Sequence, residues 1–93
     1  MKFEWDDKKH TANVKKHGVS FYDAQMAFSD PNHIIAKDLA HSGSEQRYYC
    51  FGKVNDAIMT VRFTRRGDTT RIIGAGYWRK GKAIYEKKEN HLH

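Results

Sequence analysis

The sequence has one cysteine, one proline and no long apolar run. A single cysteine, Cys50, excludes an internal disulfide. No stretch approaches the ~20 apolar residues that a membrane helix needs, and the polar, acidic start of the chain does not resemble a secretory signal. There is no glycine-, serine- or proline-rich linker and no internal repeat. These absences predict one cytoplasmic domain over residues 1–93, with no membrane association.

The composition is that of a small basic globular protein. The chain has 93 residues, of which 39% are hydrophobic and 13% aromatic, enough for one modest core. Its formal net charge is +6 and its pI is about 9.6. A positive charge on so small a domain favours a polyanionic partner, above all nucleic acid. The alternative is that the charge only keeps the protein in solution.

Two helices are predicted in the first third of the chain, after a short strand at residues 3–5. The first is capped by Asp6 or Asp7 and ends at Gly18, a residue that readily adopts the left-handed conformation of a C-cap. It has few apolar residues and is expected to lie on the surface. The second begins at the N-cap Ser20 and ends before Pro31. The apolar face of this second helix holds Phe21, Ala24 and Phe28.

The rest of the chain is predicted to be rich in β-strands. A short strand over 33–36 and a polar loop over 37–45 precede strands at 46–52, 57–64 and 69–77. Asn55-Asp56 and residues 65–68 supply the turns, and residues 79–89 form a last helix. The predicted fold class is α+β: β-α-α, then an antiparallel meander and a C-terminal helix. The helices are expected to pack on one sheet face, leaving the other exposed or free for a partner.

Residues spread over nearly the whole chain resemble one known family in order and spacing. The N-terminal half carries Trp5-Asp6, Asn13, Lys16-His17-Gly18, Phe21, Ala24, Phe28 and Asp30-Pro31. The centre carries His41-Ser42, Glu45, Arg47 and Gly52, and the last third carries Arg71-Ile72-Ile73-Gly74-Ala75 and Tyr85-Glu86. In this order they resemble the BrnT toxins of type II toxin–antitoxin systems.

The resemblance implies a RelE-like fold, ribonuclease activity and a BrnA-type antitoxin. Family members commonly assemble as two toxins with two antitoxins, and the antitoxin supplies the contact with DNA. Many members carry an arginine at the end of the last strand, where this chain has Gly76. The role of that arginine would then pass to Arg79 or be absent.

RNA can be cleaved without a metal when its own 2′-hydroxyl attacks the neighbouring phosphorus. The enzyme must supply a base, an acid and cations for the charge that develops on the phosphate. His41 is the leading acid–base candidate, because imidazole exchanges protons near neutral pH. The alternative is a loop histidine that caps a turn with Ser42. Glu45 is its candidate partner, and the alternative for Glu45 is a surface ion pair with Arg47.

Arginines on three successive strands are candidates for binding phosphate, since the guanidinium fork makes two parallel hydrogen bonds. Arg47, Arg62 and Arg71 form an anion site if they share one sheet face. Their alternatives are pairing with Glu45 or Asp68, or solvation at an edge. Arg47 and Arg71 are assigned to the catalytic set and Arg62 to RNA binding. Arg65, predicted in a turn, is a further RNA-binding candidate.

The segment 77–80 combines aromatic and basic side chains. Aromatic rings stack on bases, and adjacent cations hold phosphates. Tyr77 and Lys80 are assigned to RNA binding and Arg79 to the catalytic set, whereas Trp78 is expected to fasten the last helix to the core. No metal or cofactor is expected, because one cysteine and scattered histidines do not form a zinc site. Two alternatives to an enzyme stay open: a non-catalytic nucleic-acid-binding module and a protein that only holds an acidic antitoxin.

Overall fold

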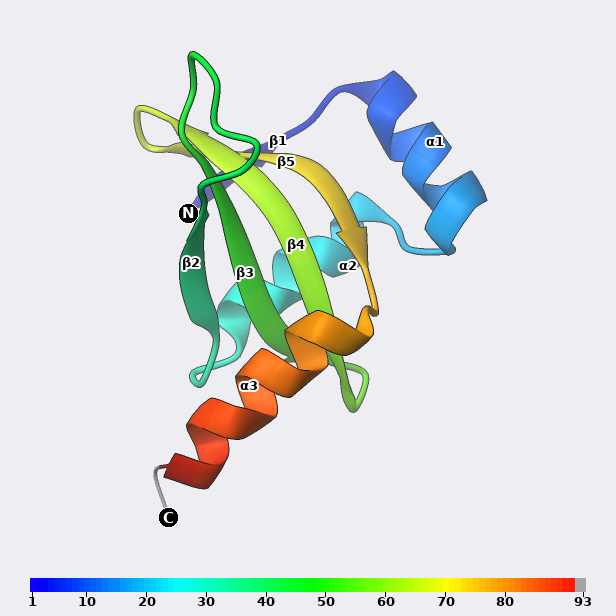
Figure 1. Ribbon diagram of the computed structural model, residues 1–93. Helices are drawn as coiled ribbons and strands as arrows, with labels where there is room; N and C mark the ends of the chain where they lie inside the picture. The colour runs from blue at the N-terminus through cyan, green and yellow to red at the C-terminus, as the bar shows by residue number, and fades with distance from the viewer. Residues whose placement is uncertain (92–93) are drawn as a thin grey trace.

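The computed structural model describes residues 1–91, with side chains described to residue 89. These residues form a five-stranded sheet in the order β1-β5-β4-β3-β2, antiparallel except for the parallel pair β1–β5 (Figure 1). The elements are β1 (Lys2–Glu4), α1 (Asp7–His17), α2 (Phe21–Gln25), the 3-10 helix η1 (Met26–Ser29), β2 (Ile34–Asp38), β3 (Arg47–Val54), β4 (Ala57–Arg66), β5 (Thr69–Gly76) and α3 (Arg79–His91). The predicted α+β class is confirmed.

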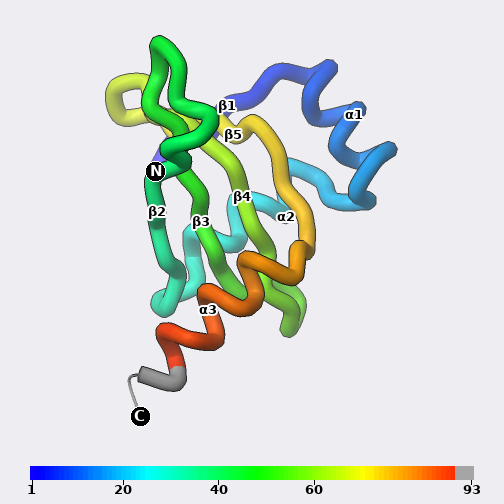
Figure 2. The backbone as a smooth tube through the Cα atoms, in the orientation of Figure 1, coloured from blue at the N-terminus to red at the C-terminus, as the bar shows by residue number. Residues whose placement is uncertain are grey.

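Helices cover both faces of the sheet, so the prediction that they pack on one face is wrong. Figure 2 shows α3 crossing one face while α2 lies behind the other. We name the faces by these helices. A Cβ on Gly52 would lie 2.2 Å from the Ala27 carbonyl oxygen, and one on Gly81 would lie 2.0 Å from Thr60 Oγ1. Gly52 therefore allows η1 to approach the sheet closely on the α2 face, and Gly81 allows α3 to approach it closely on the opposite face.

The two faces have cores of different size. The α2 face buries the larger cluster, which includes Cys50, Met59, Val61, Phe63 and Ile72 together with Phe21, Ala24 and Phe28 from α2 and η1. The α3 face buries a smaller cluster of Phe51, Ile58 and Tyr85. The predicted apolar face of the second helix is confirmed. Because strand side chains alternate, Tyr49, Thr60 and Arg62 belong to the α3 face.

Local signals fix the predicted helix ends and the first hairpin. Asp6 accepts hydrogen bonds from two backbone N–H groups at the start of α1, and Ser20 Oγ accepts one at the start of α2. Gly18 ends α1 with a φ of 68°. Asn55 and Asp56 both have positive φ, which is typical of the two-residue turn of a tight hairpin.

The second hairpin has a shorter turn than predicted. Strand β4 extends to Arg66 and β5 begins at Thr69, so the turn contains Gly67 and Asp68. Arg65 therefore lies in a strand, not in a turn, and this fixes the face on which its side chain emerges. The loop after β2 is also shorter than predicted, since β2 continues to Asp38.

A bulge in β5 decides which residues face the α3 side. Phe63 pairs with Ile72 and Arg62 pairs with Gly74, which leaves Ile73 as an extra residue. Ile72 is buried on the α2 face and Ile73 is half-buried. The adjacent apolar pair thus marks a bulge, whereas the sequence favoured a strand covered on both sides. Beyond the bulge, Gly74 and Gly76 face the α3 side.

Asn13 attaches α1 to the end of β5, beyond the residues of β5 that pair with β1. Its Nδ2 donates to the carbonyls of Val19 and Ala75 at 2.9 Å, and its Oδ1 accepts from the Ala75 N–H at 3.1 Å. Asn13 is the buried residue of α1, so this surface helix is held by hydrogen bonds more than by apolar packing. No helix within residues 1–91 is long and apolar enough to cross a membrane.

Asp30 connects the two layers of helices. It follows η1, and its Oδ2 accepts hydrogen bonds from the Tyr85 hydroxyl of α3 at 2.6 Å and from the Lys53 N–H at 2.8 Å. Burial alone would raise the pKa of Asp30, but these bonds outweigh it and the pKa lies below its ordinary value. The same bond contributes to the raised pKa of Tyr85, after the effect of burial. Tyr85 is therefore fixed by a charged partner.

Candidate functional site

A groove of about 500 Å³ opens on the α3 face between the end of β2, strands β3 and β4, and α3. His41 from the loop after β2 and Lys80 from α3 line it, together with Tyr49 and Arg62 from the sheet and Trp78 from the segment before α3. The groove therefore brings together three of the predicted site residues: His41, Arg62 and Lys80. They come from segments far apart in the sequence, and α3 must cross the sheet to bring them together.

His41 is fixed by the carboxylate of Asp38. Its Nδ1 lies 3.1 Å from Asp38 Oδ1 and 3.0 Å from Oδ2, and its backbone N–H also donates to Oδ1. The Asp38 side chain is 3% exposed and that of His41 is 57% exposed. With Nδ1 donating to Asp38, Nε2 is the ring nitrogen left for a substrate. The same loop is tied down by Ser42, whose hydroxyl donates to the Asp38 carbonyl at 2.6 Å.

The electrostatics around Asp38 keep its carboxyl ionised. Burial alone would raise its pKa, but the His41 hydrogen bond and the neighbouring Tyr49 hydroxyl outweigh burial, so the pKa of Asp38 lies below its ordinary value. Burial and the Asp38 carboxylate raise the pKa of Tyr49, against a smaller opposing effect of Arg62. Tyr49 therefore carries its proton at neutral pH, beside an anionic Asp38.

Arg62 has no hydrogen-bond or ion-pair partner among the described residues, although it is half-buried. Its Nε is buried without an acceptor. A Cβ added to Gly74 would lie 4.0 Å from Arg62 Cδ and Nη1, so the side chain extends over the glycine in β5. A half-buried guanidinium without an acceptor is costly to keep, and a ligand with acceptor atoms would offset that cost.

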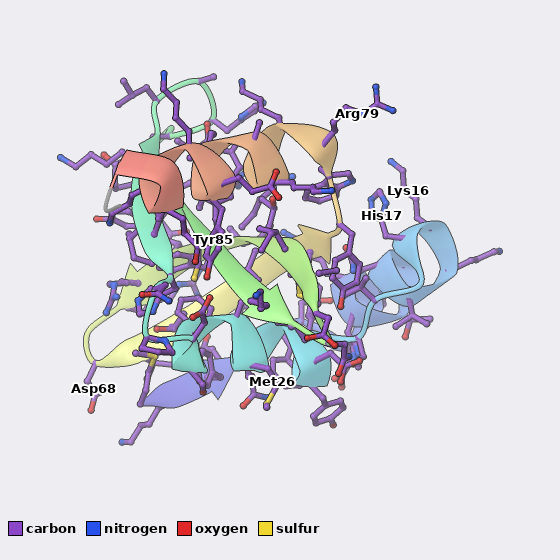
Figure 3. All side chains as sticks on the ribbon, turned by 90° about the horizontal axis from the view of Figure 1, so that it is seen from below. Lys16, His17, Met26, Asp68, Arg79 and Tyr85 are labelled. Carbon is purple, nitrogen blue, oxygen red and sulfur yellow. The ribbon has the colours of Figure 1, made fainter. Side chains whose placement is uncertain are left out.

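Trp78 occupies the space beyond Gly76. A Cβ on Gly76 would lie 2.5 Å from Trp78 Cε2, so the indole ring lies directly over the glycine. The His17 ring meets it edge-on, with centroids 5.1 Å apart. Where the resemblance leads us to expect an arginine at the strand end, this chain places an aromatic ring. Figure 3 shows Arg79 at the start of α3, directed away from the body of the molecule.

Three other predicted residues lie on the same face but outside the groove. Arg47 and Arg71 flank Thr64 across β3, β4 and β5, so they share a face with Arg62, a point that the sequence left open. Arg71 Nη1 is paired with Glu4 Oε2 at 2.5 Å. Glu45 is paired with Arg66 at 3.1 Å, not with Arg47. The pKa of Glu45 is lowered first by Arg66 and more weakly by Arg47 and Arg71, so these charges form one network.

The remaining predicted residues are not brought to the groove. Arg65 emerges on the α2 face, where its guanidinium lies 5.7 Å from the centroid of the Phe63 ring. Tyr77 and Arg79 line a separate hollow of about 520 Å³ on the other side of α3. Tyr77 is 44% exposed, and its hydroxyl donates weakly to the Val54 carbonyl at 3.4 Å. Trp78 lines both hollows and forms the wall between them.

Sequence reasoning missed Asp38 and Tyr49. The spacing Asp-x-x-His was a usable signal, because it allows the carboxylate to reach the imidazole across a turn. The sequence pattern assigned Asp38 to a polar loop and not to the end of β2, so its pairing with His41 was not predicted. Cys50 is buried, and burial raises the pKa of its thiol to about 12, so it is no nucleophile. Within residues 1–91, no three His, Cys, Asp or Glu side chains are grouped to hold a metal ion.

Comparison with known proteins identifies the family of the chain. No curated protein matches the chain. The family model described as "Ribonuclease toxin, BrnT, of type II toxin-antitoxin system" matches residues 5–81 of the 93. The match includes strands β2 to β5, the His41 loop and the start of α3, which confirms the resemblance found in the sequence. It implies an RNA target and an antitoxin protein as partner. The chain therefore belongs to the BrnT family of ribonuclease toxins of type II toxin–antitoxin systems.

Proposed function

We propose that this chain is a metal-independent endoribonuclease whose reaction takes place at the His41 end of the groove. The observation that carries this proposal is the pairing of His41 Nδ1 with the buried Asp38 carboxylate, beside Arg62 and Lys80. A histidine held at one nitrogen by a carboxylate presents the other in a defined orientation, as general acid–base catalysis requires. These two cations, together with Lys37 in the same groove, can stabilise the negative charge of the phosphate.

In the proposed reaction, the 2′-oxygen of one ribose bonds to the neighbouring phosphorus and the P–O5′ bond breaks. His41 Nε2 takes the proton of the 2′-hydroxyl, and the leaving 5′-oxygen takes a proton from Lys80 or from water at the open rim. The products are a 2′,3′-cyclic phosphate and a free 5′-hydroxyl. Arg62 stabilises the charge that develops on the phosphate oxygens, and Asp38 stabilises the imidazolium of His41.

The other predicted residues receive different roles in this proposal. Glu45 and Arg71 are engaged in ion pairs, so we assign them to holding the sheet end and the His41 loop in place. Arg47 lies two residues before Tyr49 on the same face and extends the positive surface toward the flanking phosphates. Tyr77 and Arg79 would contact only RNA that passes beyond Trp78, and Arg65 would contact none that lies in the groove.

The experiment is cleavage of a naked RNA by the purified protein in EDTA. We expect the wild type to cut with the chelator present and His41→Ala to lose about 10²-fold to 10⁴-fold in rate, the range that general acid–base catalysis supplies. The matched control is His33→Ala, a half-buried histidine outside the groove whose Nδ1 lies 2.7 Å from the Asp30 carbonyl. Cleavage that requires added metal, or an active His41→Ala, contradicts the proposal.

A non-catalytic interaction protein is the second candidate, and one observation favours it. The Trp78 ring fills the place over Gly76 where many family members carry an arginine. Such a protein would leave RNA intact and still bind its antitoxin. Intact RNA together with greater thermal stability on antitoxin addition would therefore support the interaction role over the enzyme.

For the partner, we propose a BrnA-type antitoxin in a complex of two toxins and two antitoxins. The support is family membership, together with a net charge of +6 that suits an acidic partner. DNA would be contacted through the antitoxin, and the complex would reside in the cytoplasm. Co-expression with the neighbouring antitoxin and measurement of the mass of the purified complex by light scattering test the stoichiometry.

A further inference from the structure

Beyond the acid–base groups, the groove has the features of a binding site for one flat ring. Its walls are the aromatic side chains of Tyr49, Phe51 and Trp78, with Ile84 of α3 on the open side. The rings of Tyr49 and Phe51 are stacked, with centroids 5.8 Å apart and planes at 20°. Apolar and aromatic walls with few polar atoms are typical of pockets that take an organic ring, and they do not suit a bare phosphate.

The charges of the groove indicate the rest of the ligand. Among the described residues that line it are Lys37, Arg62 and Lys80 and no acidic side chain, and the Asp38 carboxylate is bonded to His41. Arg62 has no acidic partner among the described residues, whereas Arg66 and Arg71 on the same face are both paired. Its buried Nε without an acceptor is a separate sign that an acceptor atom is supplied from outside. A ligand with a flat ring, acceptor atoms and adjacent negative charge is a nucleotide.

We infer that the groove binds one unpaired nucleobase of the RNA, stacked against its aromatic wall, with the phosphates of that nucleotide at Arg62, Lys37, Lys80 and His41. This inference rests on the proposed ribonuclease function and names its substrate class: single-stranded RNA. A base inside a duplex is stacked on its neighbours and cannot enter, so paired RNA is excluded. The volume of about 500 Å³ suits a single nucleotide more than a longer segment.

The experiment measures binding and not cleavage, so that it stays informative if the chain is not an enzyme. The probe is a fluorescein-labelled 2′-O-methyl RNA pentamer, which lacks the attacking hydroxyl. It is compared with the same pentamer carrying an abasic central position and with the pentamer annealed to its complement. We expect the intact pentamer to bind about tenfold more tightly than the abasic one, as stacking of one base on an aromatic ring supplies. The duplex should bind still more weakly.

Two isoleucines of similar exposure supply the variants. Ile84→Trp fills the groove and should remove the preference for the intact pentamer over the abasic one, because no base can then enter. Ile35→Trp is the matched control: Ile35 is 40% exposed on β2, outside the groove, and Ile84 is 38% exposed. Ile35→Trp should keep the preference. Circular dichroism checks that both variants are folded.

Equal affinity for the intact and abasic pentamers in the wild type would overturn the inference, because contacts to phosphate would then account for all binding. Tighter binding of the duplex would overturn it as well. Base-dependent binding without any cleavage of normal RNA would keep the nucleobase site and refute the proposed ribonuclease function. Cleavage together with base-independent binding would do the reverse.

Discussion

The buried carboxylate of Asp38 holds Nδ1 of His41 at 3.0 Å, and this contact joins the end of β2 to the loop that follows it. It has a structural and a chemical consequence. The loop is fixed at its beginning, and the imidazole has one nitrogen engaged and one available. In the proposed reaction, Asp38 positions His41 and does not itself contact RNA.

Removing the charge of Asp38 tests this positioning role. We expect Asp38→Asn to lower kcat on RNA by about 10²-fold, with little change in KM, because the amide neither fixes the same tautomer nor stabilises an imidazolium. The pH profile of kcat should change shape, which loss of folding alone would not cause. Asp68→Asn, with a side chain 78% exposed in the last hairpin, is the control. Unaltered kcat and pH profile would refute the role.

Two arginines on β4 provide a matched test of the RNA-binding face. Arg62→Gln should weaken binding of single-stranded RNA and lower the slope of log affinity against log salt by about 1, as loss of one phosphate contact does. Arg65→Gln should leave both unchanged, since Arg65 emerges on the opposite face over Phe63. Fluorescence anisotropy at several salt concentrations measures both values. Equal effects of the two substitutions would place the RNA elsewhere.

Asn13 should matter for stability far more than its surface helix suggests. Asn13→Ala leaves the buried backbone groups of Val19 and Ala75 without partners, so we expect a loss of about 2–4 kcal/mol in the free energy of unfolding. Urea denaturation measures it. Asn32→Ala, on the exposed turn after Asp30, is the control and should cost under about 1 kcal/mol.

The close approach of α3 to the sheet predicts a strong effect at one glycine. In Gly81→Ala the new methyl would overlap Thr60 Oγ1 at 2.0 Å and Phe51 Cδ1 at 2.9 Å, so α3 must shift. We expect a loss of about 1–3 kcal/mol in stability, the usual cost of overpacking, and a misshapen groove. Gly43→Ala is the control, because nothing lies within 4 Å of its added Cβ. A melting temperature equal to that of the wild type would show that α3 packs less closely.

Stability should fall in acid partly because of Asp30. The pKa of Asp30 in the folded protein lies below the ordinary value of an aspartate, since hydrogen bonds from Tyr85 and backbone N–H groups outweigh burial. Its contribution is therefore present above that value and is lost as the pH falls through the folded pKa. We expect Asp30→Asn to be less stable than the wild type at pH 7 and to lose less stability between pH 5 and pH 3. Urea unfolding at both pH values measures the difference.

The sequence by itself determined what short-range chemistry controls. The N-caps at Asp6 and Ser20, the left-handed Gly18 and the Asn55-Asp56 turn all depend on residues within a few positions of one another. Each was predicted, the first N-cap as either Asp6 or Asp7. The alternation within β3 and within β4 was also predicted, but it left open whether Arg47 and Arg62 share a face, which the register of the two strands decides. The family could also be identified from the sequence, because the order and spacing of its motifs are properties of the chain alone.

Only the tertiary structure decided what depends on contacts distant in sequence. Nothing local indicates that Ile73 is a bulge residue, that α3 crosses the face opposite α2, or that Glu45 pairs with Arg66 instead of Arg47. The groove exists because Gly81 lets α3 approach Thr60 and because β2 extends far enough to bring Asp38 under His41. Each of these is a packing outcome, in which burial of apolar surface selects among local conformations of similar free energy.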